Sequence, residues 1–268
     1  MSLQERLHGL RVASREGSLT ARVSGPEDDF PSWAGGHSAF NDHCVADINA
    51  LPPITTLDLS YLNVSPECGQ AILHNMHKFT KLDLVNVNIG ESQTDGAFLL
   101  RLALNLRNNT SIRALALNNM GVTDSVVEHI AAALQTNTTL ETLNLAHNVI
   151  TDAGLMSLAN ALAGVTTAGV AHPGGGNHGL RELYLSDTEI TDGGVQYMLE
   201  RAPLFKTLQE VSFDGWTKSV DDMRMVLRRN DPVGNHAELL RRREMGRGRL
   251  LPPDPYAPWD VLNAPTTQ

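Results

Sequence analysis

The sequence contains little cysteine, few aromatic residues and no long apolar run. Its only cysteines are Cys44 and Cys68. One pair is too few for the disulfide framework of a small secreted protein, which favours a reducing compartment. No apolar run approaches the roughly 20 residues that span a bilayer, so we expect no membrane insertion. The net charge of −9 leaves little basic charge for binding nucleic acid in bulk. These absences favour a cytoplasmic protein whose partners are other proteins.

The N-terminal stretch offers one alternative compartment. It lacks the apolar core of a secretory signal, but Arg6, Arg11 and Arg15 lie on a weakly amphipathic background, as in a mitochondrial presequence. Glu5 and Glu16 weaken that interpretation, because such presequences contain few acidic residues. We predict a cytoplasmic location, cytoskeletal or flagellar, and keep a mitochondrial one as the alternative.

What the sequence has in abundance is one repeated phrase, L/I/F-x-x-L-x-L-x-x-x-x-I/V, followed each time by a helix-like stretch. Five copies begin at Ile54, Phe79, Ile112, Leu140 and Leu180, and a weaker sixth begins at Leu208. The alternating leucines have the period of a half-buried strand, and the apolar residues after them have helical spacing. Each unit is too small to bury its apolar face alone, so the units must stack. The predicted fold is α/β, a leucine-rich repeat solenoid with a curved parallel sheet on the concave side and helices on the convex side.

The composition divides the chain into five segments. Residues 218–249 hold nine basic and five acidic residues, a net charge of about +4, whereas residues 24–36 are rich in turn formers and acids. The predicted segments are a flexible N-terminal arm (1–35), an N-terminal cap (36–53), the leucine-rich repeat domain (54–217), a basic helical segment (218–249) and an extended proline-rich tail (250–268). The Gly-rich insertion at 164–179 is either a flap that contacts a partner or a surface-loop insertion without function (surface drift), and we favour the second.

Polar residues mark the predicted ends of the repeat helices. Ser65 precedes Pro66, a favourable N-cap followed by proline at the first helical position. Thr-Asp pairs at 123–124, 151–152 and 191–192 supply capping oxygens at the same place in later units. Asn108, Asn109 and Asn137 lie where helices should end, and we expect them to act as C-caps because asparagine tolerates left-handed backbone angles.

These residues together resemble the leucine-rich repeats of the ribonuclease-inhibitor type. The resemblance rests on the L-x-x-L-x-L phrase, on T-D-x-G at 151–154 and 191–194, and on the N-T-T-L junction, and it covers about residues 51–216. Relatives of this type include NOD-like receptors, Ran GTPase-activating proteins, tropomodulins and many ciliary or flagellar proteins, so the resemblance is specific for fold and unspecific for function. One departure is visible. The family's usual asparagine, which bonds to backbone where the strand turns away, is present only at Asn148, and the matching positions hold Leu62, Val87, Met120 and Thr188.

The chain shows no convincing catalytic constellation. His43 and Cys44 are adjacent, but sequence neighbours rarely adopt nucleophile–base geometry and no third group orients them, so we expect a buried or capping role for Cys44. The Gly-rich stretch with His172 and His178 lacks the G-K-S/T ending of a phosphate loop. We therefore predict no enzyme activity, no cofactor and no metal site.

The outer face of the predicted sheet is the candidate binding surface. Strand alternation points the third, fifth and seventh positions of each phrase away from the helices. Five of these side chains are acidic and one is basic, which suits a basic or small-residue protein segment, with Tyr184 as an aromatic anchor. Ordinary solvated surface is the alternative. The predicted contact residues are Asp58, Asp83, Asn118, Asn144, Tyr184 and Asp214 on the face, and Tyr256 and Trp259 on the tail.

The favoured function is a non-catalytic interaction or scaffold subunit of a larger assembly, cytoskeletal, flagellar or organellar. It would bind other proteins through the repeat face and the terminal arms. The resemblance implies two alternatives. One is a GTPase-activating protein like the Ran activators, with Arg113, Asn118 and Asn119 as candidate residues. The other is an actin-end binder like the tropomodulins. The charge argues against nucleic acid, and any such contact would be made through Arg241, Arg242 and Arg243.

Overall fold

The computed structural model describes residues 10–15, 18–23, 38–60, 62–89, 96–166, 170, 175–214 and 218–230. All of them lie in one compact unit, which ends at Asn230. The predicted arginine contacts at 241–243 and the tail residues Tyr256 and Trp259 lie outside the described residues, as does most of the basic segment.

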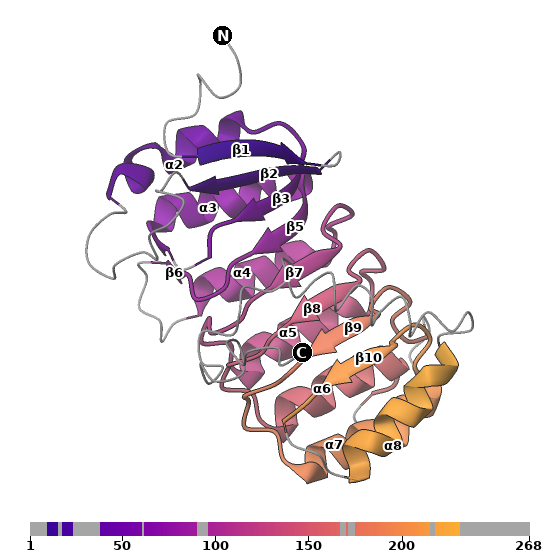
Figure 1. The fold of residues 1–268 in the computed structure, drawn as a ribbon. Helices are drawn as coiled ribbons and strands as arrows, with labels where there is room; N and C mark the ends of the chain where they lie inside the picture. The colour runs from indigo at the N-terminus through magenta and orange to yellow at the C-terminus, as the bar shows by residue number, and fades with distance from the viewer. Residues whose placement is uncertain are drawn as a thin grey trace, which may run out of the picture. The chain divides into compact units, whose positions relative to one another are not determined.

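Eight strands form one sheet, in the order β1-β2-β3-β5-β7-β8-β9-β10. Their bounds are Leu10–Arg15 (β1), Ser18–Val23 (β2), Ile54–Asp58 (β3), Phe79–Asp83 (β5), Ala114–Ala116 (β7), Thr142–Asn144 (β8), Glu182–Tyr184 (β9) and Glu210–Ser212 (β10). β1 and β2 pair antiparallel, and every later neighbour in the order is parallel. From β3 onward the order in the sheet follows the order in the chain, because each unit adds one strand beside the last (Figure 1).

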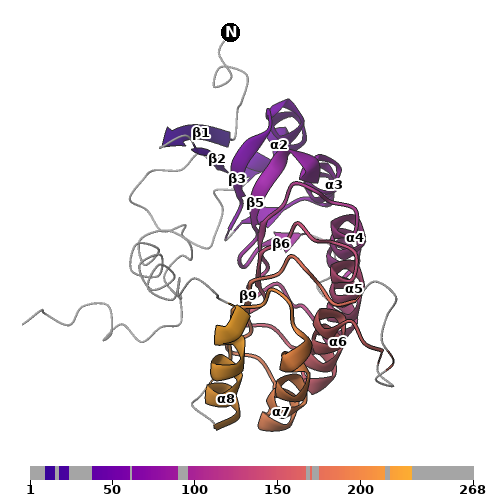
Figure 2. The ribbon, with the colours of Figure 1, turned by 90° about the vertical axis from the view of Figure 1, so that its right-hand side faces the viewer.

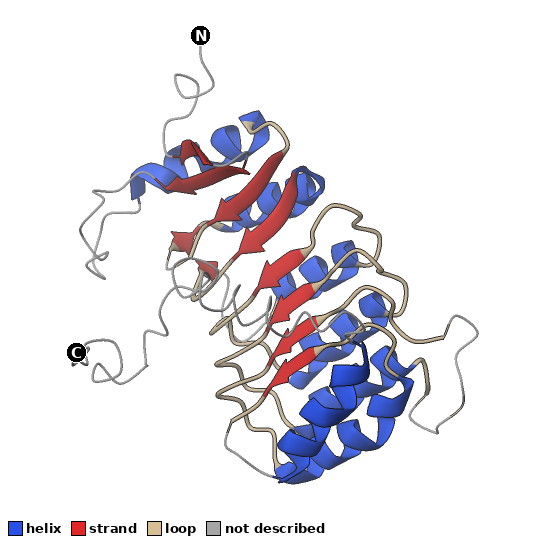
Figure 3. Cartoon of the chain, turned by 45° about the vertical axis from the view of Figure 1, so that its right-hand side comes forward, coloured by secondary structure: helices blue, strands red, loops and turns tan. Residues whose placement is uncertain are grey.

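The helices alternate with the strands along the chain. They are α2 (Ser38–Ala50), α3 (Pro66–Asn75), α4 (Ala97–Leu106), α5 (Asp124–Leu134), α6 (Asp152–Ala163), α7 (Asp192–Arg201) and α8 (Lys218–Leu227), with 3-10 turns η1 (Met76–Lys78), η2 (Ala202–Leu204) and η3 (Arg228–Asn230). Helices α2 to α7 lie on one side of the sheet (Figures 2 and 3). Two short strands, β4 (Asn63–Val64) and β6 (Asn88–Ile89), pair beyond the first turns. Among the described helices, none combines the length and apolar character needed to cross a bilayer.

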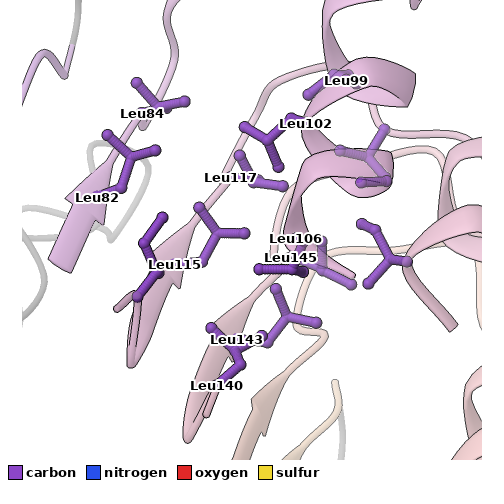
Figure 4. Close-up of a cluster of buried hydrophobic side chains, with 14 of the residues drawn as sticks. Leu82, Leu84, Leu99, Leu102, Leu106, Leu115, Leu117, Leu140, Leu143 and Leu145 are labelled. Atoms are coloured by element: carbon purple, nitrogen blue, oxygen red, sulfur yellow. The ribbon is translucent and has the colours of Figure 1, made fainter. Parts of the chain in front are cut away.

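The inner leucines form the core between the two layers. In the first five units the strand leucines at the fourth and sixth phrase positions are almost fully buried, and Figure 4 shows three of these pairs on the side of the helices. The sixth unit has the buried Val211 and Phe213 at these positions. Leu115, Leu143 and Leu183 are in register on neighbouring strands, so leucine packs on leucine from one unit to the next. The predicted α/β repeat architecture is confirmed, and with it the assignment of these leucines to the inner face.

Residues 10–23 correct the prediction of a flexible N-terminal arm. β1 and β2 form a hairpin, and β2 extends the sheet parallel to β3, with Ala21 opposite Leu57. Leu10 and Ala21 are fully buried, and the Leu10 N–H donates to the buried Asp47 carboxylate at 3.0 Å. The physical reason is the open edge of β3, whose backbone groups need partners that the first repeat alone cannot supply. The turn-rich stretch 24–37 lies outside the described residues.

The four predicted helix starts are confirmed, and in three of them the predicted capping hydrogen bond is present. Ser65 Oγ accepts the Cys68 N–H at 3.2 Å with Pro66 at the start of α3. Thr151 and Thr191 cap α6 and α7 in the same way, each accepting a backbone N–H two residues on at 3.2 Å. Thr123 makes no such bond. The next residue, Asp124, accepts hydrogen bonds from the following unit.

The aspartates of the Thr-Asp pairs join consecutive units. Asp124 accepts the Thr151 N–H at 2.9 Å, the Thr151 hydroxyl at 2.6 Å and the Gly154 N–H at 3.1 Å. Asp152 accepts the Thr191 N–H at 2.8 Å and the Thr191 hydroxyl at 2.7 Å. A Cβ on Gly154 would lie 2.5 Å from an Asp124 carboxylate oxygen. The T-D-x-G motif therefore encodes contact between units, with glycine required where the carboxylate of the previous unit approaches.

Asn148 has the role expected of the family's asparagine. Its Nδ2 donates to the carbonyls of Leu117 (2.9 Å) and Leu145 (2.8 Å), and its Oδ1 accepts the N–H groups of Met120 and Val122 (both 3.0 Å). One side chain thus satisfies the turn backbone of two units.

Units without that asparagine use other partners at the same turn. The Val87 N–H meets the Met120 sulfur at 3.2 Å, and the Thr188 hydroxyl donates to the Leu185 carbonyl at 2.8 Å. The residue before this position is left-handed in four turns, namely Asn86, Asn119, His147 and Asp187.

The asparagines predicted as C-caps do not have the left-handed backbone expected of that role. None of Asn108, Asn109 and Asn137 is left-handed. Asn137 instead bridges two units: its Nδ2 donates to the Leu106 and Asn109 carbonyls (2.6 and 2.9 Å), and its Oδ1 accepts the Thr139 and Leu140 N–H groups (both 2.9 Å). The prediction was wrong because the orphan carbonyls at the helix end are reached by an asparagine of the next unit, not by a local turn.

Asn177 repeats this pattern one unit later. It donates to the Leu134 and Asn137 carbonyls at 2.7 and 2.8 Å and accepts the Gly179 and Leu180 N–H groups at 2.9 and 2.7 Å. The end of the 164–179 insertion is therefore part of the repeat framework rather than surface drift.

Candidate functional site: the outer face of the sheet

Pairing register places the outward side chains in rows across the sheet. One row runs through Asp58, Asp83, Ala116, Asn144 and Tyr184, because these residues are direct neighbours on successive strands. Neighbouring strands lie about 4.8 Å apart, so each residue in a row is directly beside the next. Four of the predicted contact residues, Asp58, Asp83, Asn144 and Tyr184, are thus brought into one line, with Ala116 between Asp83 and Asn144.

Acidic side chains meet in pairs on strands β3 and β5 and on strands β9 and β10. Asp58 lies beside Asp83, and Glu182 lies beside Glu210 in the preceding row. Lys81 donates to Asp83 at 2.6 Å and offsets part of the repulsion at the first pair. At the second pair, Glu182 accepts hydrogen bonds from the Thr142 hydroxyl (3.2 Å) and the Tyr184 hydroxyl (3.1 Å). Like charges side by side on a sheet are unfavourable, so a cationic group placed between them would be stabilised.

Asn144 departs from the prediction that it faces a partner. It is only 3% exposed, and its Oδ1 accepts the Ala146 N–H at 3.0 Å. The amide folds back along its own strand, and the Tyr184 ring is its register neighbour. Ala116, Ala146 and Val85 are likewise buried. These small side chains at the middle of the face are therefore enclosed by their neighbours, and Asn144 bonds within its own strand region. Alternation fixes the side of the sheet on which a residue lies but not its exposure.

Asn118 and Asp214 follow strands β7 and β10. Asp214 is exposed, and its carboxylate accepts the Asp187 N–H in the adjacent turn. The Asn118 Oδ1 is buried and has no hydrogen-bond partner among the described residues. Leaving a buried acceptor unpaired is costly, about 1–3 kcal/mol, so this oxygen favours an added donor.

The residues named for GTPase activation do not form one cluster. Arg113 precedes β7 and its guanidinium is paired with Glu141, whereas Asn118 and Asn119 follow the same strand. Arg113 and Asn118 are five residues apart, which is roughly 16 Å along an extended chain at about 3.3 Å per residue. Asn119 Nδ2 donates to Asn86 Oδ1 at 3.0 Å. An arginine held by a carboxylate and distant from the asparagines does not make a joint catalytic site.

One pocket among the described residues is small. A pocket between the last strand and α8 has a volume of about 40 Å³ and is lined in part by Thr191, Asp192, Phe213 and Val220. Small-molecule sites usually measure about 300–1,000 Å³. Within the described ranges, His, Cys, Asp and Glu do not gather in threes in a way that would hold a metal ion.

Comparison with known proteins places two family models on the chain. The model described as "TMOD/LMOD Leucine-rich domain", that of the tropomodulins and leiomodins, matches residues 63–170, and a leucine-rich repeat model matches residues 176–199. The chain is a leucine-rich repeat protein. No curated protein matches it.

Two solved structures are similar to this chain. A structure titled "Leiomodin-1 Actin-Binding Site 2 (ABS2)" is 21% identical, covers 66% of this chain and 95% of its own, and has a TM-score of 0.49. The tropomodulin C-terminal domain of Caenorhabditis elegans is 15% identical, covers 76% of this chain and 98% of its own, and has a TM-score of 0.43.

Proposed function

We propose that this protein is a non-catalytic binding subunit of a larger cytoplasmic assembly, and that it holds a basic segment of a partner protein against the outer face of its sheet. The observation that carries the proposal is the arrangement of that face. Two acidic pairs lie on it, Asp58 with Asp83 and Glu182 with Glu210, and in the strand order the unpaired Asn118 oxygen lies between them. Lysine and arginine side chains are donors only, so a basic segment would satisfy both features.

Tyr184 is the anchor of this proposed interface. It is half-buried on β9, its hydroxyl bonds Glu182, and a partly exposed tyrosine offers apolar area at a small entropic cost. The terminal segments that we also expect to contact partners, with Tyr256 and Trp259, remain a proposal that rests on their sequence.

Actin is the first specific partner to test. This candidate is supported by the match of residues 63–170 to the tropomodulin and leiomodin domain model. It agrees with the actin-end binder implied by the sequence resemblance, and it would give the protein a cytoskeletal location. A tropomodulin-like activity would slow elongation of actin filaments from one end.

The experiment compares two tyrosines in an elongation assay with the full chain. Tyr184→Ala removes the proposed anchor from the sheet face. Tyr197→Ala is the matched control, since Tyr197 is also half-buried and hydrogen-bonded, its hydroxyl donating to Asn160 at 3.0 Å, but it lies on α7 in the helix layer. We expect Tyr184→Ala to weaken binding by at least ~30-fold, the roughly 2 kcal/mol of a hot spot, and Tyr197→Ala to leave it unchanged.

The outcomes separate the two proposals. Normal filament elongation in the presence of the wild-type chain would dismiss actin but leave the face open to another partner. Equal loss of partner binding in both tyrosine variants would point to a general loss of stability, and undiminished binding of Tyr184→Ala would overturn the proposed face.

A further inference from the structure

Cys44 and Cys68 are far apart in sequence but meet in the structure. Cys44 lies on α2 and Cys68 on α3, and these two helices pack side by side (Figure 1). Both side chains are fully buried, and their sulfurs are within hydrogen-bonding distance of each other. The two thiols therefore face one another across the junction between the N-terminal cap and the first repeat.

The surroundings of Cys44 favour the reactive thiolate form. Its sulfur receives hydrogen bonds from the Cys68 thiol and from Ser65, and these bonds lower the pKa of Cys44 although burial and nearby Asp47 oppose them. Ser65 is the N-cap of α3, so the sulfur lies at the positive end of that helix, where a thiolate is stabilised. The bond to Cys44, together with burial, raises the pKa of Cys68. The hydrogen bond between the two thiols thus holds each sulfur where it could resolve an oxidised form of the other.

We propose that Cys44 and Cys68 are a redox-sensitive pair that closes to a disulfide on reaction with a peroxide and so fastens the cap helix α2 to the first repeat. The proposal does not depend on the function proposed above. Disulfides in reducing compartments are usually transient or redox-sensing, which is the role that this pair fits.

The chemistry balances with one peroxide for each pair. The Cys44 thiolate attacks a peroxide oxygen, the O–O bond breaks, and the departing hydroxide takes a proton to become water, which leaves a sulfenic acid. The Cys68 sulfur then attacks the sulfenic sulfur. The S–S bond forms, the S–O bond breaks, and a second water carries away the Cys68 proton. The sulfurs lose two electrons, and the peroxide gains them.

Burial controls how fast this happens. Neither sulfur is exposed, so a peroxide reaches Cys44 only when α2 opens locally. Once the disulfide has formed, α2 can no longer separate from α3. A small dithiol breaks the S–S bond by thiol–disulfide exchange and restores the form in which α2 can open.

The test uses the full chain with hydrogen peroxide, followed by intact-mass analysis and peptide mapping. We expect the wild type to lose the mass of two hydrogen atoms and to yield a 44–68 cross-linked peptide that a dithiol reverses. Cys44→Ser and Cys68→Ser serve as controls and should give no such product. Hydrogen exchange of the α2 amides should slow by roughly 300-fold in the oxidised wild type, the effect expected from closing a loop of this length.

Three results would overturn the proposal. One is oxygen addition to either cysteine without the cross-link. Another is no reaction of the folded chain while the urea-unfolded chain is oxidised. The third is a cross-link that leaves α2 exchange unchanged, because it would show that the disulfide does not fasten the helix. If a serine variant fails to fold, the wild-type mass and exchange measurements still decide.

Discussion

Truncation of one inner leucine measures how strongly the stacked units depend on one another. Leu143 lies on β8, is fully buried, and is in register with Leu115 and Leu183 (Figure 4). Leu143→Ala deletes three carbons, which is roughly 2.4 kcal/mol of transfer free energy at about 0.8 kcal/mol each. Because neighbouring strands hold the site open, a cavity adds to this cost, and the expected loss of stability is about 2–5 kcal/mol.

Urea unfolding followed by circular dichroism would measure this loss, with an unchanged slope showing that only stability has changed. In a thermal scan, we expect a fall of about 2–4 °C for each kcal/mol at this domain size. The control is Thr142→Ala on the outer face of the same strand, which loses one hydrogen bond to Glu182 and about 0.5–1.5 kcal/mol. A loss below about 0.5 kcal/mol for Leu143→Ala would refute the assignment of the inner face.

Two further pairs of substitutions test the contacts between units. Gly194→Ala should destabilise the protein by about 1–3 kcal/mol, because the added Cβ would lie 2.3 Å from an Asp152 oxygen. In the control, Gly193→Ala, the added Cβ meets no atom closer than 3.4 Å, so this variant should be neutral or more stable by up to about 1 kcal/mol. Equal melting temperatures for the two would contradict the T-D-x-G contact. Asn137→Ala leaves buried backbone groups of two units unpaired and should lower the free energy of unfolding in urea by about 2–4 kcal/mol. The exposed Asn108→Ala is the control and should cost less than about 0.5 kcal/mol. Similar costs for the two variants would show that Asn137 is a local cap only.

The repeat architecture could be predicted from the sequence because its signals are local. The leucine alternation marks the inner face within each phrase, and Ser65–Pro66 or Thr151 marks a helix start within a single turn of chain. These patterns depend on residues two to four positions apart, so a linear sequence displays them directly. The same periodicity predicted which side of the sheet Tyr184 and Asp58 would occupy.

The remaining features were decided only by contacts between distant parts of the chain. The β1–β2 hairpin forms because the edge of β3 is open, and Asn137 bonds carbonyls about thirty residues earlier, which no local pattern reveals. Asn144 lies on the predicted side but is buried, because exposure depends on the neighbouring strands. Cys44 and Cys68 meet because α2 packs against α3. Local periodicity determines secondary structure and the inner face, whereas burial and partnership depend on which segments the tertiary fold places side by side.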